Sequence, residues 1–165
     1  MSFSAYAQSL DFGGGYTENG FAGNFDYNIY LSNDSYVQIG LNALFAKTKF
    51  VTETKSFEIP YSNYLLNAGY FLPLLENASQ TMQFSAGGGL SLGYEAVGKN
   101  NNMPEGISIQ STSSFIYGGL LSGELNVSVA KNLLVLLKFN QYYHLNSNVG
   151  NMSMYAGAGI RFYIE

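Results

Sequence analysis

The fold of this chain can be read from residues 24–31, Asn24-Phe25-Asp26-Tyr27-Asn28-Ile29-Tyr30-Leu31. The odd-numbered positions of this stretch carry Phe, Tyr, Ile and Leu, and the even-numbered positions carry Asn, Asp, Asn and Tyr. Successive side chains of a β-strand point to opposite faces, so this alternation predicts a strand with one apolar and one mostly polar face. The turn-forming residues Ser32-Asn33-Asp34-Ser35 follow at once and indicate where the strand ends.

The same alternation recurs along the whole chain, and helical periodicity is nowhere convincing. The segments predicted as strands, with Gly, Asn, Ser or Asp clusters between them, are residues 9–16, 24–31, 37–46, 63–70, 82–95, 115–127, 133–144 and 153–164. Leu120, Leu134 and Leu136 break the pattern because they are apolar residues on otherwise polar faces. These segments predict an all-β fold, an eight-stranded antiparallel up-and-down transmembrane β-barrel.

The composition of the chain excludes several kinds of site. The chain has 165 residues, 47% of them hydrophobic and 11% charged, with one His and no Cys. These numbers fit a single domain and exclude a disulfide framework, a thiol nucleophile and a cysteine zinc site. A formal charge of -4 leaves no basic face for phosphates, so we expect no direct contact with nucleic acid. We also expect no cofactor and no metal site.

The amino-terminal residues 1–8 are predicted to be a tail left by a removed leader. Ala5 and Ala7 precede Gln8 in the pattern of a signal-peptidase site, although the basic and long apolar parts of a signal peptide are missing. An ordinary ragged terminus is the alternative. Residues 9–165 are then one barrel domain. A transmembrane helix is excluded because no run of about 18 consecutive apolar residues exists.

The volume of each face indicates which one points inward. The polar faces are rich in Gly, Ser and Asn, and the interior of an eight-stranded barrel is only wide enough for side chains to fill it. The apolar faces, rich in Phe, Tyr, Leu, Ile and Val, are therefore expected to contact lipid. Six charged residues fall within predicted strands, all on polar faces: Asp11, Asp26, Glu95, Glu124, Lys138 and Arg161. A Lys or Arg facing lipid would cost about 2–4 kcal/mol at the membrane midplane.

These six residues are expected to form a structural cluster of charges in the lumen. An unpaired charge in a narrow interior is costly, so mutual pairing into a salt-bridge plug is the main interpretation. An ion path or gate is the alternative, because perturbed charges can also mark function.

Connections and aromatic residues predict the orientation in the outer membrane. Aromatic residues near strand ends are expected to form a girdle: Tyr16, Phe45, Tyr64, Tyr94, Phe115 and Tyr143. With both termini periplasmic, the external connections are residues 17–23, 47–58, 98–113 and 146–151, and the inner turns are residues 32–35, 73–80 and 130–132. The two longest external loops carry four lysines that are suited to contacts with partners: Lys47, Lys49, Lys55 and Lys99.

The last strand ends in an expected assembly signal. Gly159, Phe162 and Ile164 follow the pattern by which the barrel-assembly machinery recognises its clients, although Glu165 rather than an aromatic residue ends the chain. Outer-membrane lipid and that machinery are therefore expected partners.

Several stretches carry a family resemblance. They are Leu66-Asn67-Ala68-Gly69-Tyr70-Phe71, the run from Gly87 to Glu95, Phe115-Ile116-Tyr117-Gly118-Gly119, and the run from Gly157 to Ile164. From about residue 59 onward the chain resembles the conjugal transfer protein TraO family of conjugative transposons. The resemblance implies an outer-membrane component of a DNA-transfer apparatus, an anchor or surface-recognition element, with other transfer or outer-membrane proteins as partners. It supplies no catalytic motif.

Three other functions are alternatives on the residues alone. His144 lies near Ser147 in sequence, which suggests a lipid-modifying barrel enzyme as an alternative. No acid lies beside His144 in sequence to orient its ring, so we expect His144 to form a hydrogen bond at the barrel rim and the chain not to be an enzyme. A general barrel of the adhesin or membrane-stability type shares every feature above. A soluble lipocalin-like carrier would turn its apolar faces inward. The run Gly87-Gly88-Gly89 lies within a strand, so strand curvature or close packing of a lumen residue explains it better than a phosphate loop.

Overall fold

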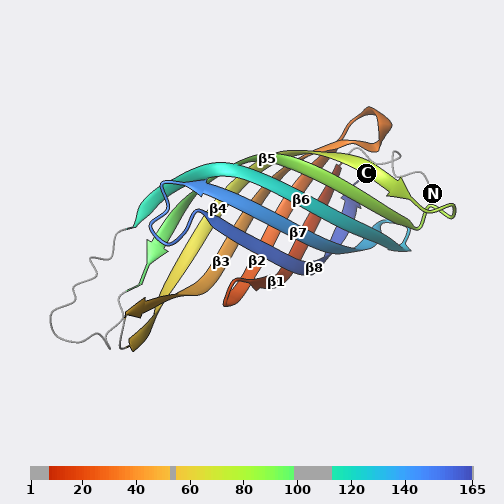
Figure 1. The fold of residues 1–165 in the computed structure, drawn as a ribbon. Helices are drawn as coiled ribbons and strands as arrows, with labels where there is room; N and C mark the ends of the chain where they lie inside the picture. Colours follow the sequence, from red (N-terminus) through yellow and green to blue (C-terminus); the bar gives the residue numbers. More distant parts are fainter. Residues whose placement is uncertain (1–7, 53–54, 99–112, 165) are drawn as a thin grey trace.

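Eight antiparallel strands form one closed barrel in the order of the sequence (Figure 1). The computed structural model describes residues 8–52, 55–98 and 113–164. The strands are β1 (Gln8–Thr17), β2 (Gly20–Tyr30), β3 (Tyr36–Thr52), β4 (Lys55–Glu76), β5 (Met82–Val97), β6 (Ser114–Ala130), β7 (Leu133–Leu145) and β8 (Met152–Ile164), with a 3-10 turn, η2, at Ser32–Asp34. Across the described part of the chain, no helix is long and apolar enough to cross a membrane.

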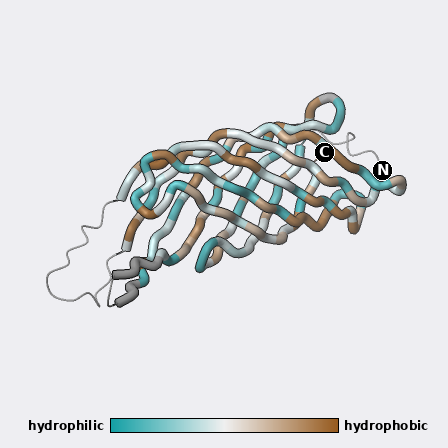
Figure 2. The backbone as a smooth tube through the Cα atoms, in the orientation of Figure 1, coloured by the Kyte–Doolittle hydropathy of each residue, from teal (hydrophilic) through white to brown (hydrophobic). Residues whose placement is uncertain are grey.

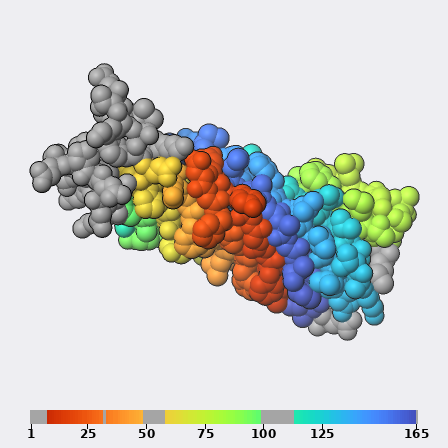
Figure 3. Space-filling view, turned by 90° about the horizontal axis from the view of Figure 1, so that it is seen from below, coloured from red at the N-terminus to blue at the C-terminus, as the bar shows by residue number. Residues whose placement is uncertain are grey.

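The barrel is closed by its first and last strands. Asp11 of β1 pairs with Asp26 of β2 on one side and with Arg161 of β8 on the other. β1 and β8 lie side by side and run obliquely across the molecule in the space-filling view (Figure 3). β1 starts and β8 finishes at the same end of the barrel, which we call the terminus end. The opposite end, where β1 turns into β2, is the loop end.

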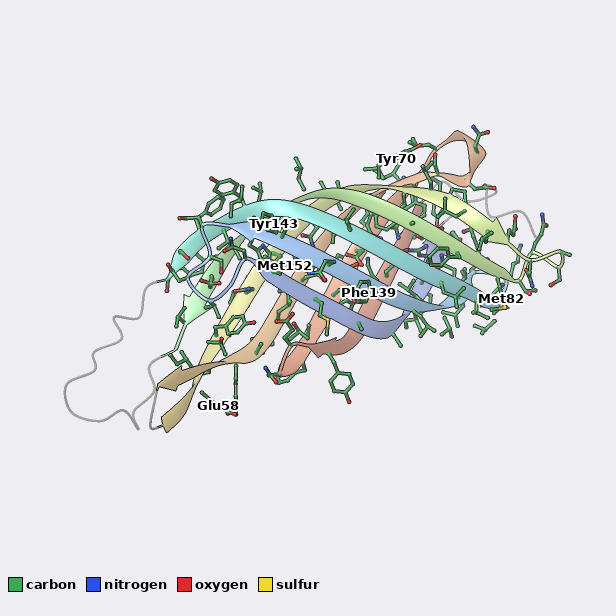
Figure 4. The ribbon with its side chains drawn as sticks, viewed as in Figure 1. Glu58, Tyr70, Met82, Phe139, Tyr143 and Met152 are labelled. Carbon is green, nitrogen blue, oxygen red and sulfur yellow. The ribbon has the colours of Figure 1, made fainter. Side chains whose placement is uncertain are left out.

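The apolar faces point outward, as predicted. Leu90 and Leu121 are 70% and 69% exposed, whereas Asp11, Glu124 and Arg161 are 0% exposed. Along the barrel wall, hydrophobic and hydrophilic residues alternate on each strand (Figure 2). Tyr70, Phe139 and Tyr143, labelled in Figure 4, are 46%, 48% and 49% exposed. An apolar outer surface of this extent is suited to lipid rather than to water.

The predicted girdle lies toward the loop end. Tyr16 pairs with Phe21, and Phe21 with Phe45, while Tyr64 pairs with Tyr94 and Tyr94 with Phe115 on the neighbouring strands. The outward rings of Phe21 and Phe45 are 5.3 Å apart. This part of the wall therefore carries a continuous outward row of aromatic side chains.

Two predicted connections are wrong in their bounds. Residues 17–23 contain only a two-residue turn, because β1 continues to Thr17 and β2 begins at Gly20. Residues 47–58 are not a loop, because β3 continues to Thr52 and β4 begins at Lys55. This stretch lacks the apolar alternation that lipid imposes, but its Thr, Val and Phe residues still favour an extended backbone. The predicted connection at 98–113 lies almost entirely outside the described residues.

The predicted inner turn at residues 73–80 is also too long. β4 continues through Pro73 to Glu76, and the pairing with β5 shifts register between Pro73 and Leu75. A bulge of this kind accommodates a proline inside a strand. The remaining turn is closed by Asn77, whose side-chain oxygen accepts hydrogen bonds from the backbone of Thr81 and Met82 at 2.8 and 2.9 Å.

The lumen holds more aromatic volume than the sequence predicted. Tyr36, Phe71, Tyr142 and Tyr155 are buried inside the barrel, together with the pattern-breaking leucines at 120, 134 and 136. A glycine on the neighbouring strand makes room for one of these rings. A Cβ atom on Gly87 would lie 2.6 Å from the ring of Phe71, so for the first glycine of the run at 87–89 the structure favours close packing of a lumen residue, one of the two explanations offered by the sequence.

Candidate functional site in the lumen and at the loop end

The centre of the lumen holds a continuous network of five charged side chains. Arg161 donates to both carboxylate oxygens of Asp11, at 2.7 and 2.6 Å, and to Glu124 at 2.7 Å. Lys138 lies 2.9 Å from Glu124 and 2.7 Å from Asp26. Each member is at least 96% buried. The order Asp11, Arg161, Glu124, Lys138, Asp26 alternates acid and base, so each member lies next to an opposite charge inside the barrel.

Neutral side chains donate and accept further hydrogen bonds with the members of this charge network. Glu124 accepts hydrogen bonds from the Tyr36 hydroxyl at 2.6 Å and from Gln38 Nε2 at 3.0 Å. Gln38 in turn accepts from Lys138 at 2.7 Å, and Asn24 donates to Asp26 at 2.6 Å. Buried ion pairs of this kind are stable only when extra hydrogen bonds satisfy the remaining polar atoms. The network therefore links six of the eight strands, β1, β2, β3, β6, β7 and β8, and fixes their relative positions.

Two aromatic rings that the sequence did not single out support the bases. Tyr36 and Phe71 are stacked, with ring centroids 4.9 Å apart and planes inclined by 7°. The Arg161 guanidinium carbon lies 5.1 Å from the Tyr36 ring centre, and the Lys138 ammonium lies 5.9 Å from that of Phe71. Both contacts have the geometry of cation–π interactions. The period of two would have placed both rings inside, since Tyr36 precedes Gln38 by two residues.

Glu95 does not belong to the charge network. It is fully buried, but it lies at the loop end of β5, where it accepts from Ser147 Oγ at 2.7 Å and from the backbone N–H of Asn148 at 2.8 Å. The prediction grouped it with the other five charges because it lies on the same face of its strand. Glu95 lies farther along the barrel axis than the five paired charges. Its hydrogen bonds come from Ser147 and Asn148 of the β7–β8 connection and not from Lys138 or Arg161.

A layer of apolar side chains separates Glu95 from the charge network. Asp26, Gln38 and Lys138 of the charge network lie on β2, β3 and β7. Four to six residues nearer the loop end, the same strands carry the buried side chains of Ala22, Leu44 and Tyr142. The whole layer consists of Ala22, Leu44, Leu65, Ile116, Leu120, Tyr142 and Tyr155. The charge network and this layer lie one above the other in the lumen. The interior of an eight-stranded barrel is only wide enough for side chains to fill it, which argues against an ion path.

Above this layer lies a small polar pocket, which we call the vestibule. Its volume is about 110 Å³, and it lies between the β1–β2 turn, the projecting part of β3 and the β7–β8 connection. Its lining includes Glu18, Lys47, Tyr61, Asn63, Glu95 and Ser153. Asn63 is 2% exposed, and within the described ranges its side-chain oxygen has no hydrogen-bond partner.

His144 contacts a serine other than the one expected. Its Nε2 lies 3.0 Å from Ser153 Oγ, whereas Ser147 donates to Glu95. The predicted rim hydrogen bond is thus present, with Ser153 as the partner. His144 Nδ1 finds no partner among the residues that the structure describes, so no acid orients the ring as a catalytic triad requires.

The predicted contact lysines lie in different environments. Lys47 is exposed on the outer face of β3 and forms an ion pair of 3.4 Å with Glu58 of β4, which Figure 4 shows on the projecting hairpin. Lys49 and Lys55 lie within β3 and β4 rather than in a loop. Lys99 lies outside the described residues.

The residues of the expected assembly signal all lie on β8. Phe162 and Ile164 are exposed on the outer face, and Gly159 occupies a position where a Cβ atom would meet the backbone of β1. Recognition by the assembly machinery stays a prediction. The described ranges 8–52, 55–98 and 113–164 contain no group of three or more His, Asp or Glu side chains that could hold a metal ion.

Comparisons with known proteins agree with this architecture. The model of a family described as conjugative transposon protein TraO matches residues 5–164. No curated protein matches the chain. A major outer membrane protein of Thermus thermophilus has a similar structure, with a TM-score of 0.72, 11% identity, and coverage of 95% of this chain and 98% of that chain.

Two further solved structures are similar. The amino-terminal β-barrel domain of OprF from Pseudomonas aeruginosa gives a TM-score of 0.63 at 11% identity, and neisserial surface protein A gives 0.61 at 14% identity. Each comparison covers 95% of this chain and 96% of the other chain. At these identities the likeness shows the fold, that of small outer-membrane barrels.

Proposed function

Since the chain belongs to the conjugative transposon protein TraO family, we propose that it is a non-enzymatic outer-membrane barrel that serves a DNA-transfer apparatus as an anchor or surface-recognition element. The filled lumen supports this proposal most directly. A barrel whose cross-section is occupied by a charge network and an apolar layer has its contact surfaces on its outer wall and at its two ends. Transport of DNA or of a folded protein through such a lumen is not part of the proposal.

The outer wall would anchor the protein in the outer membrane. Its exposed apolar residues face away from the lumen on all eight strands, and the outward aromatic row lies near the loop end. This arrangement fits lipid as the first partner, with both termini in the periplasm and the loop end at the cell surface. Assembly by the barrel-assembly machinery would precede that contact.

The loop end would provide the recognition surface. There the β3–β4 hairpin projects past its neighbours and the vestibule opens beside it. Partners expected at this surface are other proteins of the transfer apparatus or of the outer membrane. Contact with the transferred DNA itself is not expected, because the chain carries a net charge of -4.

Transfer frequency in mating assays tests the proposal. Donor cells that lack this chain should transfer the conjugative element less often, and the wild-type chain supplied in trans should restore transfer. A matched control is the Gly23→Ala variant, whose added Cβ would meet no atom closer than 3.7 Å. Unchanged transfer in the deletion strain would reject a role in conjugation.

A further inference from the structure

The wall of the barrel is uneven at the loop end. The pairing of β2 with β3 ends at Phe21 and Phe45, whereas the pairing of β3 with β4 continues to Thr52 and Lys55. Figure 1 shows the β3–β4 hairpin projecting beyond β1 and β2. Within the described ranges, β3 therefore has a strand partner on one side only from Ala46 to Thr52.

The backbone direction of this free edge follows from its neighbours. The Phe45 carbonyl oxygen points at Gly20 of β2, where a Cβ atom would overlap it. Along a strand, hydrogen-bonding groups point to the same side at every second residue, so Lys47, Lys49 and Val51 also present their N–H and C=O groups away from β4. Pro60, the register partner of Lys47, agrees with this assignment because its carbonyl accepts from Gly98 on the opposite side, at 2.8 Å.

An open edge of this length is a template for another strand. The three alternate residues Lys47, Lys49 and Val51 offer three N–H donors and three C=O acceptors on the side away from β4, and natural proteins normally cover, bend or shorten such an edge. We infer that the free edge of β3 at residues 46–52 binds an extended segment of a partner polypeptide, which adds to the barrel wall as a strand. Main-chain hydrogen bonds would supply affinity, as in other strand-addition complexes.

The vestibule would supply specificity for that segment. It lies directly beside the free edge, since Lys47 and Thr48 of β3 and Glu18 and Asn19 of the β1–β2 turn line it together. Its acceptors are the Glu18 carboxylate and the buried Asn63 oxygen, beside the Glu95 carboxylate, which already accepts hydrogen bonds from Ser147 and the Asn148 backbone. Alternate side chains of an added strand point to one face, so one of them would enter the vestibule. The chemistry favours a basic or amide side chain that donates hydrogen bonds.

A second copy of this chain is a poorer occupant. Pairing of two β3 edges about a two-fold axis, in the register that uses all three residues, places position 49 opposite position 49, and both are lysines. Like charges directly opposite are destabilising, and lysines on an edge strand are a known device against edge-to-edge association. The edge is therefore assigned to a different polypeptide.

This inference rests on the proposed function, because the partner is sought among the transfer proteins. Hydrogen–deuterium exchange of peptides covering residues 46–52 would be compared in two sets of outer-membrane vesicles. One set comes from cells with all transfer genes and the other from cells with this chain alone. Strand addition should slow exchange at least about tenfold in the first set.

Two substitutions at one position distinguish backbone pairing from charge. Lys49→Pro removes the outward N–H without touching the β4 ladder, whereas Lys49→Thr removes the charge and keeps the N–H. Slow exchange should persist in Lys49→Thr and vanish in Lys49→Pro. Heat-modifiable migration of both variants in gels would show that both barrels fold. Glu18→Gln should weaken the protection severalfold by removing a vestibule carboxylate, and unchanged protection would exclude the vestibule from recognition.

Equal exchange in the two vesicle sets would overturn the inference. Slow exchange already present in vesicles that hold this chain alone, with a dimeric mass in detergent, would assign the edge to a second copy instead. Failure of the proposed function has a separate signature, since there the deletion strain would transfer normally whatever the exchange rates show.

Discussion

Asp11 and Asp26 lie directly opposite each other on β1 and β2, and each receives its positive charge from a different part of the barrel. Arg161, on the other neighbour of β1, binds Asp11, while Lys138 reaches Asp26 across the lumen from β7. Two adjacent buried carboxylates repel each other, so both bases are needed to keep this strand pair in register.

Removal of either base should destabilise the barrel strongly. Lys138→Met or Arg161→Met leaves buried carboxylates without their counter-ion, which typically costs about 3–5 kcal/mol. The free energy of unfolding in urea, measured in lipid vesicles, gives this difference. Lys47→Met is the matched control, because its ion pair with Glu58 is half exposed and is expected to contribute at most about 1 kcal/mol. Equal stability of all three variants would contradict the network.

A second substitution should recover part of the lost stability. In the double variant Lys138→Met with Asp26→Asn, the carboxylate that lost its ammonium is neutral, so the desolvation penalty of an unpaired charge disappears. A double-mutant cycle on the same unfolding measurement should give a coupling energy of about 0.5–3 kcal/mol for this pair. Additive effects would mean that Lys138 and Asp26 do not interact.

The size of Gly87 should limit the packing of the lumen. Gly87→Ala would bring its Cβ within 2.6 Å of the Phe71 ring and of the Tyr70 carbonyl oxygen, so we expect a loss of about 1–3 kcal/mol from overpacking. Gly23→Ala, with at least 3.7 Å of room, should be nearly neutral. Thermal unfolding in detergent compares the two, and a larger loss for Gly23→Ala would show that the inward and outward faces are exchanged.

Orientation in the membrane can be tested with single cysteines, since the chain has none of its own. Gly150→Cys lies in the β7–β8 connection in open space, and Ala78→Cys lies in the exposed β4–β5 turn at the terminus end. A membrane-impermeant thiol reagent on intact cells should label residue 150 and spare residue 78. The reverse pattern would invert the proposed topology.

The Ser153–His144 contact should have no catalytic role. His144→Ala and Ser153→Ala are expected to leave the mass spectrum of the outer-membrane lipids unchanged relative to cells with the wild-type chain. The physical reason is that, in the part of the chain that the structure describes, no acid lies against His144 Nδ1 to orient the ring. A lipid modification that depends on both residues would replace the non-enzymatic proposal with that of a lipid-modifying barrel.

The fold could be predicted from the sequence because lipid imposes a strict rule on every outward position of the spanning wall. The residue types at positions such as Phe25 and Asp26 therefore predict which side of the wall each one faces, without knowledge of the rest of the chain. The same rule no longer applies beyond the aromatic row, and there the prediction failed, since Lys47 and Thr48 continue a strand without apolar alternation.

The composition of the lumen was only partly predictable. Which charges face inward follows from the period of two, but which of them meet depends on the stagger between strands, and a sequence pattern does not reveal that stagger. Glu95 was placed with Glu124 for this reason. Phe71 was missed because the predicted strand 63–70 ended one residue before it, and the space for its ring is provided by Gly87 on the neighbouring strand.

The contact between Arg161 and Asp11 also bears on the order of folding. These residues are 150 positions apart, and their strands form the seam that closes the barrel. Closing so long a loop carries a large entropic cost before any contact is gained, which makes it a late event. We therefore expect the contacts of Arg161 to form after the rate-limiting barrier, so that its loss mainly accelerates unfolding while the folding rate changes little. The rate at which the β1–β8 seam opens would then set the lifetime of the closed barrel.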